Sequence, residues 1–209
     1  MVSRDTPPDG RAARTLARRE EILAAAAALF AERGFHGVTI EDIGRSVGIT
    51  GPGLYRHFPS KDAVLAQVLI GISERLVAGG RDRVASAEGA AEALDALLAG
   101  HIAFALSEPA LITVHDRELG NVPEADRRTV RRLQRRYLEQ WVDVLAELTP
   151  DAPRVTLRAA THATFGLLNS TPHSAGALDQ HAMARLLHGM AQRALHQGSL
   201  AGAGAHGSW

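Results

Sequence analysis

Residues that could bind an anion gather in one short stretch, residues 39–61. Thr39 precedes an apolar-periodic segment and is followed three residues later by Asp42, a spacing that resembles a capping box and predicts the start of a helix. Ser60 is a second N-cap residue and places Lys61 in the first turn of another helix. Free N–H groups and the helix dipole both favour phosphate at such a terminus. The stretch therefore offers two positions suited to an anion.

A second set of polar residues lies between these two helix starts. Thr50 is a good N-cap, and Pro52 stands near the first helical position, where its missing N–H costs nothing. Leu54 and Phe58, four residues apart, give this short helix an apolar inward face. The outward face carries Thr50, Gly51, Pro52, Gly53, Tyr55, Arg56 and His57.

Three helices must position these side chains. Apolar residues recur at helical spacing from Thr15 until Gly34, which supplies a C-cap. The second helix starts after Thr39, is about two turns long and ends at Gly48. The third runs from Thr50 to Pro59. Two short helices across a tight glycine-centred turn form a helix-turn-helix.

The segment from Thr39 to Lys61 closely resembles the DNA-binding region of the tetracycline-repressor (TetR) family. The resemblance covers residues 18–69, where an apolar helix ending Phe-Ala-Glu-Arg-Gly-Phe, the helix-turn-helix, Leu-Tyr-x-His-Phe and Ser-Lys occur in order. It implies a DNA-binding regulator with phosphate contacts from Thr39, Tyr55, His57 and Lys61. It also implies major-groove contacts near Thr50 to Gly53, on double-stranded DNA with a near-palindromic operator.

This sequence departs from an ordinary recognition helix at Gly51-Pro52-Gly53, which offers almost no side-chain donors for base edges. Direct readout is then expected from Thr50, Arg45, Tyr55 and Arg56. DNA shape, and Arg11 and Arg14 in the minor groove, would supplement it.

Composition excludes several other classes. The 209 residues hold 23 Lys and Arg against 23 Asp and Glu, so bulk charge cannot attract a polyanion, and residues 1–61 carry nine basic against seven acidic residues. The absence of cysteine excludes disulfides, Cys-based zinc sites and a cysteine nucleophile. No signal peptide or membrane-length apolar run is recognised, so we expect a cytoplasmic protein with no membrane partner.

The rest of the chain also predicts helices, at about 60–79, 88–105, 109–114, 123–148, 155–169 and 178–197. The expected fold is all-α. The expected organisation is a flexible basic arm over 1–14, a DNA-binding head over 15–60, a ligand-binding and dimerisation domain over 61–197 and a disordered tail over 198–209. The tail spells a Gly-x-Gly-x-x-Gly motif, but without a preceding strand it does not indicate nucleotide binding.

The resemblance implies a homodimer that senses a small molecule in its C-terminal domain, with the last two helices forming the dimer interface. Small and apolar residues on those helices would allow close helix approach, although the same stripes could pack within one chain. The predicted interface residues are Ala159, Ala163, Gly166, Leu167, Met183, Leu186, Leu187 and Met190.

Polar and aromatic residues that interrupt apolar helical faces are candidates to line an effector pocket, or are satisfied core residues. They are His101, Phe104, His115, Tyr137, Trp141, His162, Phe165 and Asn169. The arginine stripe 127, 128, 131, 132, 135 and 136 is either a solvated face or a patch for an anionic effector such as an acyl-coenzyme A. Arg117-Glu118-Leu119 and residues 165–173 are similar to actinobacterial members linked to fatty-acid or acyl-coenzyme A metabolism.

Two other classes compete with this interpretation. His101, His115, Asp116 and His162 could converge on a divalent ion, making a metal-dependent regulator or a metalloenzyme. However, the Glu-x-x-His pairs, His-Glu-x-x-His, Gly-x-Ser-x-Gly and P-loop motifs are absent, so neither an enzyme nor a cofactor is expected. The other competitor is a multidrug sensor with an aromatic pocket. The preferred hypothesis is a repressor whose 60–79 helix connects DNA to the pocket, and whose effector favours the DNA-incompetent arrangement.

Overall fold

The computed structural model describes residues 9–173, 176 and 178–195, and all secondary structure within them is helical. The all-α prediction is therefore confirmed for this part of the chain. The helices are α1 (Asp9–Arg33), α2 (Ile40–Ser46), α3 (Gly51–Tyr55), α4 (Lys61–Ser86), α5 (Ala90–Ser107), α6 (Pro109–Glu118), α7 (Glu124–Leu148), α8 (Arg154–Leu168) and α9 (Gln180–Ala194), with 3₁₀ turns η1 (Leu119–Asn121) and η2 (Thr171–His173).

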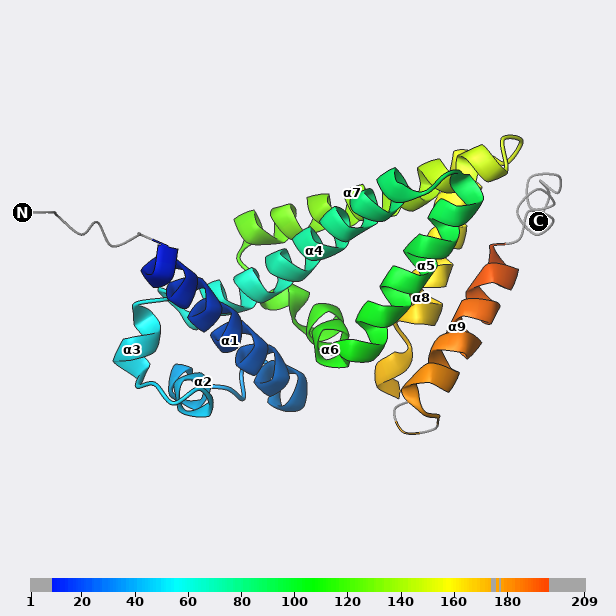
Figure 1. Cartoon of the computed structure of the whole chain (residues 1–209). Coiled ribbons are helices and arrows are strands. Elements are labelled where there is room, and N and C mark those ends of the chain that lie inside the picture. The colour runs from blue at the N-terminus through cyan, green and yellow to red at the C-terminus, as the bar shows by residue number, and fades with distance from the viewer. Residues whose placement is uncertain (1–8, 174–175, 177, 196–209) are drawn as a thin grey trace, which may run out of the picture.

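Helices α1 to α3 form one end of an elongated molecule, and α4 runs from them along α7 (Figure 1). The remaining helices α5, α8 and α9 pack at the far end, while α6 lies between the two parts (Figure 1). This arrangement agrees with the predicted head and the larger C-terminal region.

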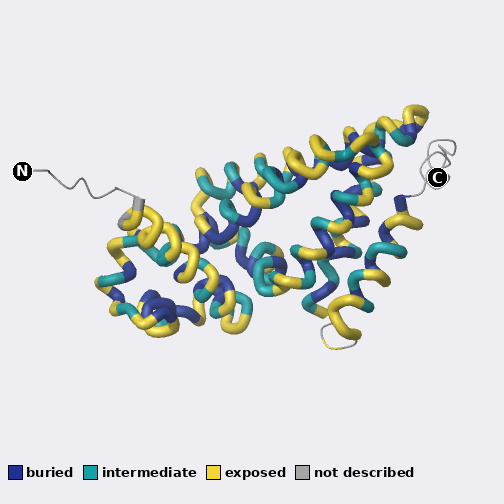
Figure 2. Tube along the Cα trace, in the orientation of Figure 1, coloured by how far each residue is buried: buried dark blue, intermediate teal, exposed yellow. Residues whose placement is uncertain are grey.

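Two hydrophobic cores hold these parts together. The first combines the head with the start of α4, up to Leu69, and with Val114 of α6, Val122 and Val130. The second begins at Val77 and joins α4, α5, α7, α8 and α9 around the fully buried Trp141. The buried segments along both cores are dark blue in Figure 2. The predicted boundary at residue 60 therefore does not coincide with the packing, because α4 and α6 complete the first core.

The long helix α4 continues past Gly79-Gly80, where the sequence predicted its end. A Cβ added at Gly80 would lie 2.4 Å from Gln140 Oε1 and 2.9 Å from Tyr137 Cε2. Gly80 is therefore a point of close approach between α4 and α7 and does not terminate the helix.

Helix α1 also differs from the prediction, because it begins at Asp9 and not near Thr15. Residues 12–17 are exposed and include the helix formers Ala12, Ala13 and Leu16, and Arg14 Nε donates to Gly10 O at 2.9 Å. Residues 9–14 are thus helical rather than a flexible arm. The rest of the predicted arm, residues 1–8, and the predicted tail lie outside the described residues.

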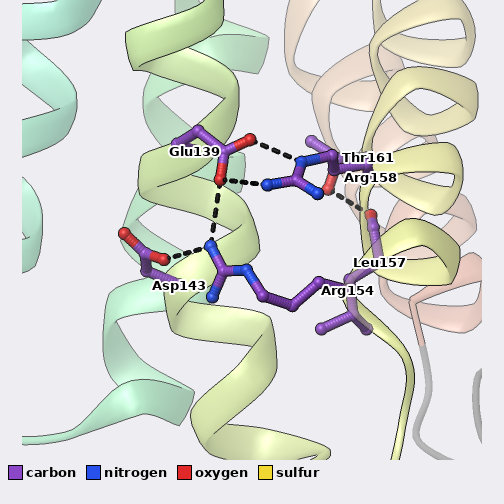
Figure 3. A network of polar contacts seen from close by, with 6 residues as sticks. All are labelled: Glu139, Asp143, Arg154, Leu157, Arg158 and Thr161. Atoms are coloured by element: carbon purple, nitrogen blue, oxygen red, sulfur yellow. Dashed lines mark hydrogen bonds and ion pairs between the residues drawn. The ribbon is translucent and has the colours of Figure 1, made fainter.

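An exposed charged network links α8 to α7 (Figure 3). Arg158 Nε donates to Glu139 Oε1 at 2.6 Å, and Arg154 donates to Glu139 at 2.9 Å and to Asp143 at 2.6 Å. These hydrogen bonds lower the pKa of Glu139 below its ordinary value, Arg158 making the largest contribution. The network bridges α8 and α7 on the outer side of the second core.

Two helices, α4 and α5, are long and apolar enough to cross a membrane by length and composition alone. Both contribute buried residues to the cores described above, as helices inside a folded protein do.

Candidate DNA interface and effector pocket

The predicted capping box at the start of α2 is present. Thr39 Oγ1 accepts from the N–H of Asp42 at 3.1 Å, and Asp42 Oδ2 accepts from the N–H of Thr39 at 3.0 Å. The Thr39 hydroxyl and main chain together lower the pKa of Asp42. The turn that follows needs Gly44, because a Cβ there would lie 2.7 Å from Ile49 O.

Helix α3 starts at its predicted cap, since Thr50 Oγ1 accepts from the N–H of Gly53 at 3.3 Å. Leu54 and Phe58 are buried in the first core, as the anchoring role requires. The helix ends at Tyr55, so Arg56 and His57 lie just beyond it and not within a helix that reaches Pro59.

Most of the predicted DNA-contact residues face solvent. Thr39, Arg45, Thr50, Pro52, Tyr55 and Arg56 are exposed, whereas Gly53, His57 and Lys61 are partly buried and Gly51 is buried. A Cβ at Gly51 would lie 3.1 Å from Glu41 Oε1, so this glycine faces α2. Any contact from Gly51 therefore has to come through its main chain.

Three basic residues that sequence reasoning did not place inside the head hold the helix-turn-helix together. Arg18 donates to Val47 O at 2.8 Å, and Arg19 donates to His57 O while its guanidinium lies 4.3 Å from the centre of the Phe58 ring. The third is Lys61, which uses two of its three N–H groups on main-chain carbonyls of residues 35 and 38. No sequence signal marks these contacts, because they depend on tertiary packing.

A cavity of about 480 Å³ opens between α4, α5, α6, α7 and α8. Seven of the eight predicted residues line it: His101, Phe104, His115, Tyr137, His162, Phe165 and Asn169. Trp141 does not, because it is fully buried behind the lining, edge-on to Tyr137 and Phe165. The other lining residues include Ile72, Leu76, Leu111, Ile112 and Leu138, so the cavity is largely apolar.

The inner end of the pocket is built on His101, which is buried. Its ring stacks on Phe165 with centroids 4.9 Å apart and on Tyr137 at 5.8 Å. Its Nδ1 lies 3.2 Å from the Tyr137 hydroxyl and its Nε2 lies 3.0 Å from Asn169 Oδ1. Burial lowers the pKa of His101 to about 4 and raises that of Tyr137 to about 12. Both groups are therefore neutral at neutral pH.

The pocket mouth is polar. His115 Nδ1 lies 3.1 Å from Asp116 Oδ1, and its Nε2 contacts the side-chain amide of Gln134. Arg131 and Arg135, one turn apart on α7, also line the pocket and have no ion pair within the described chain. The arginine stripe thus divides, because Arg127 and Arg128 pair with Glu124 instead. The mouth presents two unpaired cations to a ligand.

The predicted dimer residues separate into two groups. Ala159, Ala163 and Gly166 on α8 and Leu186 and Met190 on α9 are exposed, and Leu167 is partly buried. Met183 and Leu187 instead pack into the second core of the same chain. The exposed group leaves apolar side chains on the outer sides of α8 and α9.

The metal alternative finds no geometric support. Within residues 9–173, 176 and 178–195, no group of three or more His, Asp or Glu side chains could hold a metal ion. His101, His115, Asp116 and His162 line one cavity, but His101 is occupied by Tyr137 and Asn169.

Comparison with known proteins identifies the family. Residues 22–68 match bacterial regulatory proteins of the tetR family, and residues 87–195 match the tetracycline repressor-like C-terminal domain. The chain therefore belongs to the TetR family of transcriptional regulators, which bind DNA through a helix-turn-helix and are not enzymes.

Particular relatives are repressors. The transcriptional repressor KstR2 of Rhodococcus jostii is 31% identical over 140 residues, covering 66% of this chain and 69% of that protein. KstR2 of Mycobacterium tuberculosis is 35% identical over 131 residues, which make up 61% of this chain and 64% of that protein. This chain thus spans about two thirds of the length of the relatives it matches.

Solved structures agree with the fold. The ketosteroid transcriptional regulator KstR2 of Mycobacterium tuberculosis superposes with a TM-score of 0.70 at 26% identity, covering 83% of this chain and 92% of that one. FadR of Bacillus subtilis, in complex with stearoyl-CoA, gives 0.69 at 17% identity, covering 85% and 99%. At that lower identity the likeness shows the fold alone.

Proposed function

We propose that this protein is a homodimeric cytoplasmic repressor that leaves its operator when an amphipathic anion, such as a fatty acid or an acyl-coenzyme A, binds the pocket. We infer the ligand class from one observation. The cavity is largely apolar, and at its mouth lie Arg131 and Arg135, which have no ion pair within the described residues. The apolar body of such a ligand would replace water in the cavity, and its phosphates or carboxylate would neutralise the two arginines. The acyl group of a thioester would lie in the cavity of about 480 Å³, and its coenzyme portion would lie at the polar mouth.

Two similar proteins are associated with compounds that have a large apolar body, and of these compounds stearoyl-CoA is the anion. The KstR2 structure is that of a ketosteroid regulator, and the FadR structure holds stearoyl-CoA. Both compounds pair a large apolar body with polar groups, which suits a lining of isoleucine, leucine and phenylalanine around His101 and Asn169.

Thermal unfolding in the presence of candidate effectors tests the ligand class. Acyl-coenzyme A thioesters and free fatty acids should raise the melting temperature, whereas drug-like cations should not, because Arg131 and Arg135 repel them. Arg131→Ala and Arg135→Ala should each weaken the response. Arg136→Ala is the matched control, because Arg136 belongs to the same stripe but does not line the pocket. Stabilisation by cations alone would disprove the proposal.

The operator contacts are proposed from the exposed face of α2 and α3. Thr39, Arg45, Thr50, Pro52, Gly53, Tyr55, Arg56, His57 and Lys61 would meet DNA, with Gly51 contributing through its main chain. Lys61 has one N–H left for a phosphate, beside the two that it donates inside the head. Selecting bound sequences from random DNA would give the operator, and mapping it to promoters would name the controlled genes.

Salt dependence tests the phosphate contacts individually. Tyr55 is 51% exposed, so Tyr55→Phe removes only a hydroxyl and should weaken operator binding without destabilising the head. Lys61→Ala should reduce the salt slope by about 1 if its charge meets a phosphate. An unchanged slope for Lys61→Ala would mean that Lys61 makes only its hydrogen bonds inside the head and does not contact a phosphate.

The dimer proposal rests on the exposed apolar residues of α8 and α9. Leu186 and Met190 are 45% and 40% exposed, and a Cβ at Gly166 would meet nothing within 4 Å, which leaves room for a second helix. Leu186→Glu should convert a dimeric mass in light scattering to a monomeric one. Leu16→Glu, at an exposed leucine on α1, is the control. A monomeric mass for the unaltered protein at micromolar concentration would refute the proposal.

A further inference from the structure

Helix α6 has two contact faces that serve different parts of the molecule. Leu111, Ile112, His115 and Asp116 line the effector pocket. Val114, on the opposite side, is buried in the first core with the head helices, and α6 packs along α1. A ligand that displaces α6 would therefore also shift the contacts between α6 and the head.

The last residue of α6 makes a specific bond to the head. Glu118 is only 6% exposed, and its Oε1 accepts from the main-chain N–H of Phe35 at 3.1 Å. Its Oε2 accepts from Asn121 Nδ2 at 2.7 Å. No cation lies within ion-pair distance of this carboxylate in the described part of the chain. A buried carboxylate loses its hydration, so each of these two hydrogen bonds matters for keeping it in place.

The same residue of the head is held from α4 as well. Phe35 O accepts from Lys61 Nζ at 2.8 Å, and this ammonium also donates to Val38 O and lies 4.2 Å from the centre of the Phe35 ring. Helix α4 lines the pocket one to two turns beyond the first core, through Ile72, Ser73 and Leu76. Two helices that line the pocket thus bond to the same residue, Phe35. Lys61 of α4 donates to the Phe35 carbonyl, and Glu118 of α6 accepts from the Phe35 N–H.

Phe35 lies in the short connection between α1 and the capped start of α2. Residues 34–38 lead directly into Thr39, whose capping box fixes the first turn of α2. A change in the main chain at Phe35 would therefore reorient the helix-turn-helix relative to α1. We infer that Glu118 is a positioning residue that couples the effector pocket to the DNA-binding helices by holding the main chain at Phe35.

Hydrogen exchange of the full chain, with and without operator DNA, tests this coupling without any effector. Coupling between sites is reciprocal, so DNA bound to the head must alter the pocket helix if the pocket helix alters the head. In the unaltered protein, operator should slow exchange in residues 39–61 and also in residues 109–121, the latter by about fivefold or more. In Glu118→Ala the slowing over 39–61 should remain, while that over 109–121 should fall below about twofold.

Two further variants separate positioning from general damage. Glu118→Gln can still accept from the Phe35 N–H through its amide oxygen and should restore the response over 109–121. Arg117→Ala, at the exposed neighbouring position, should behave as the unaltered protein does.

Three outcomes would overturn the inference. They are an unchanged response of residues 109–121 in Glu118→Ala, no response there in the unaltered protein, or equal losses over both segments in the Ala and Gln variants. Failure of DNA binding itself would differ from all of these, because residues 39–61 would then show no slowing in any variant.

Discussion

Protonation of His101 should destabilise the protein at mildly acidic pH. The imidazole is buried against the rings of Phe165 and Tyr137, and each of its nitrogens already faces one neutral partner, the Tyr137 hydroxyl or Asn169 Oδ1. Neutral imidazole satisfies this arrangement with one donor and one acceptor nitrogen. A second proton would place a positive charge on a ring that is only 3% exposed, and within the described residues no carboxylate bonds to it.

The size of the effect follows from the pKa. Burial lowers the pKa of His101 from 6.5 to about 4, which corresponds by linkage to about 3 kcal/mol of unfolding free energy. Because the unfolded chain binds the proton more readily, this contribution is fully present above pH 6.5. It decreases as the pH falls and is lost once the pH passes below about 4.

Urea unfolding at several pH values and a fixed protomer concentration measures this contribution. His101→Phe keeps a ring against Phe165 and Tyr137 but does not titrate, so the carboxylates and other histidines affect both proteins alike. We expect the unfolding free energy of the unaltered protein minus that of His101→Phe to fall by most of about 3 kcal/mol between pH 7 and pH 4.5. His101→Gln, a second neutral variant, should show the same trend. A difference that stays constant over this range would refute the reasoning.

Four other substitutions give direct tests of the packing. Gly80→Ala should destabilise the protein by about 1–3 kcal/mol in urea unfolding, because its Cβ would collide with α7. Gly71→Ala in the same helix meets nothing within 4 Å and should instead stabilise it by up to about 1 kcal/mol; equal effects would contradict the close approach. Thr39→Ala removes the capping box and should cost about 0.5–2 kcal/mol, whereas no loss would show that Asp42 caps α2 alone. Glu139→Gln opens the exposed network and should cost about 1 kcal/mol or less, a loss that 1 M salt should abolish; a larger loss would mean that the network organises α8.

Local signals in the sequence predicted the head well. The Thr39 and Thr50 caps are short-range features, and each appears at its predicted position with the predicted hydrogen bond. Helical periodicity predicted the position of every long helix in the described residues, but it did not predict all of the helix ends. The prediction that α4 ends at Gly80 is wrong, because a glycine in the sequence can either end a helix or allow a neighbouring helix to approach closely.

The sequence predicted most of the residues that line the pocket, but not which aromatic residue lies behind the lining. Seven of the eight predicted lining residues face the cavity, since polar and aromatic interruptions of apolar faces meet where helices diverge. Trp141 carries the same signal but is buried one layer behind, and nothing in the sequence separates the two positions. Met183 and Leu187 likewise share a stripe with Leu186 and Met190, and only the packing of α9 on α5 shows which side is buried.

The bonds made by Glu118 and Lys61 could not be predicted, because both reach main-chain atoms far away in the sequence. An acidic residue near a helix end and a lysine in a first turn are ordinary surface features. Their partners become known only when α1, α4 and α6 are placed together.

The pocket lies where the two hydrophobic cores fail to merge. Along α4, the last buried residue of the first core is Leu69 and the first of the second core is Val77, and the pocket-lining Ile72 belongs to neither core. We expect the two cores, which α4, α6 and α7 connect, to unfold as two cooperative units. A ligand that touches Leu111 on one side and Phe165 on the other would bury apolar surface against both units at once. We expect calorimetry to show two unfolding transitions without effector and one transition with effector bound. The bound ligand would connect the two cores through apolar contacts.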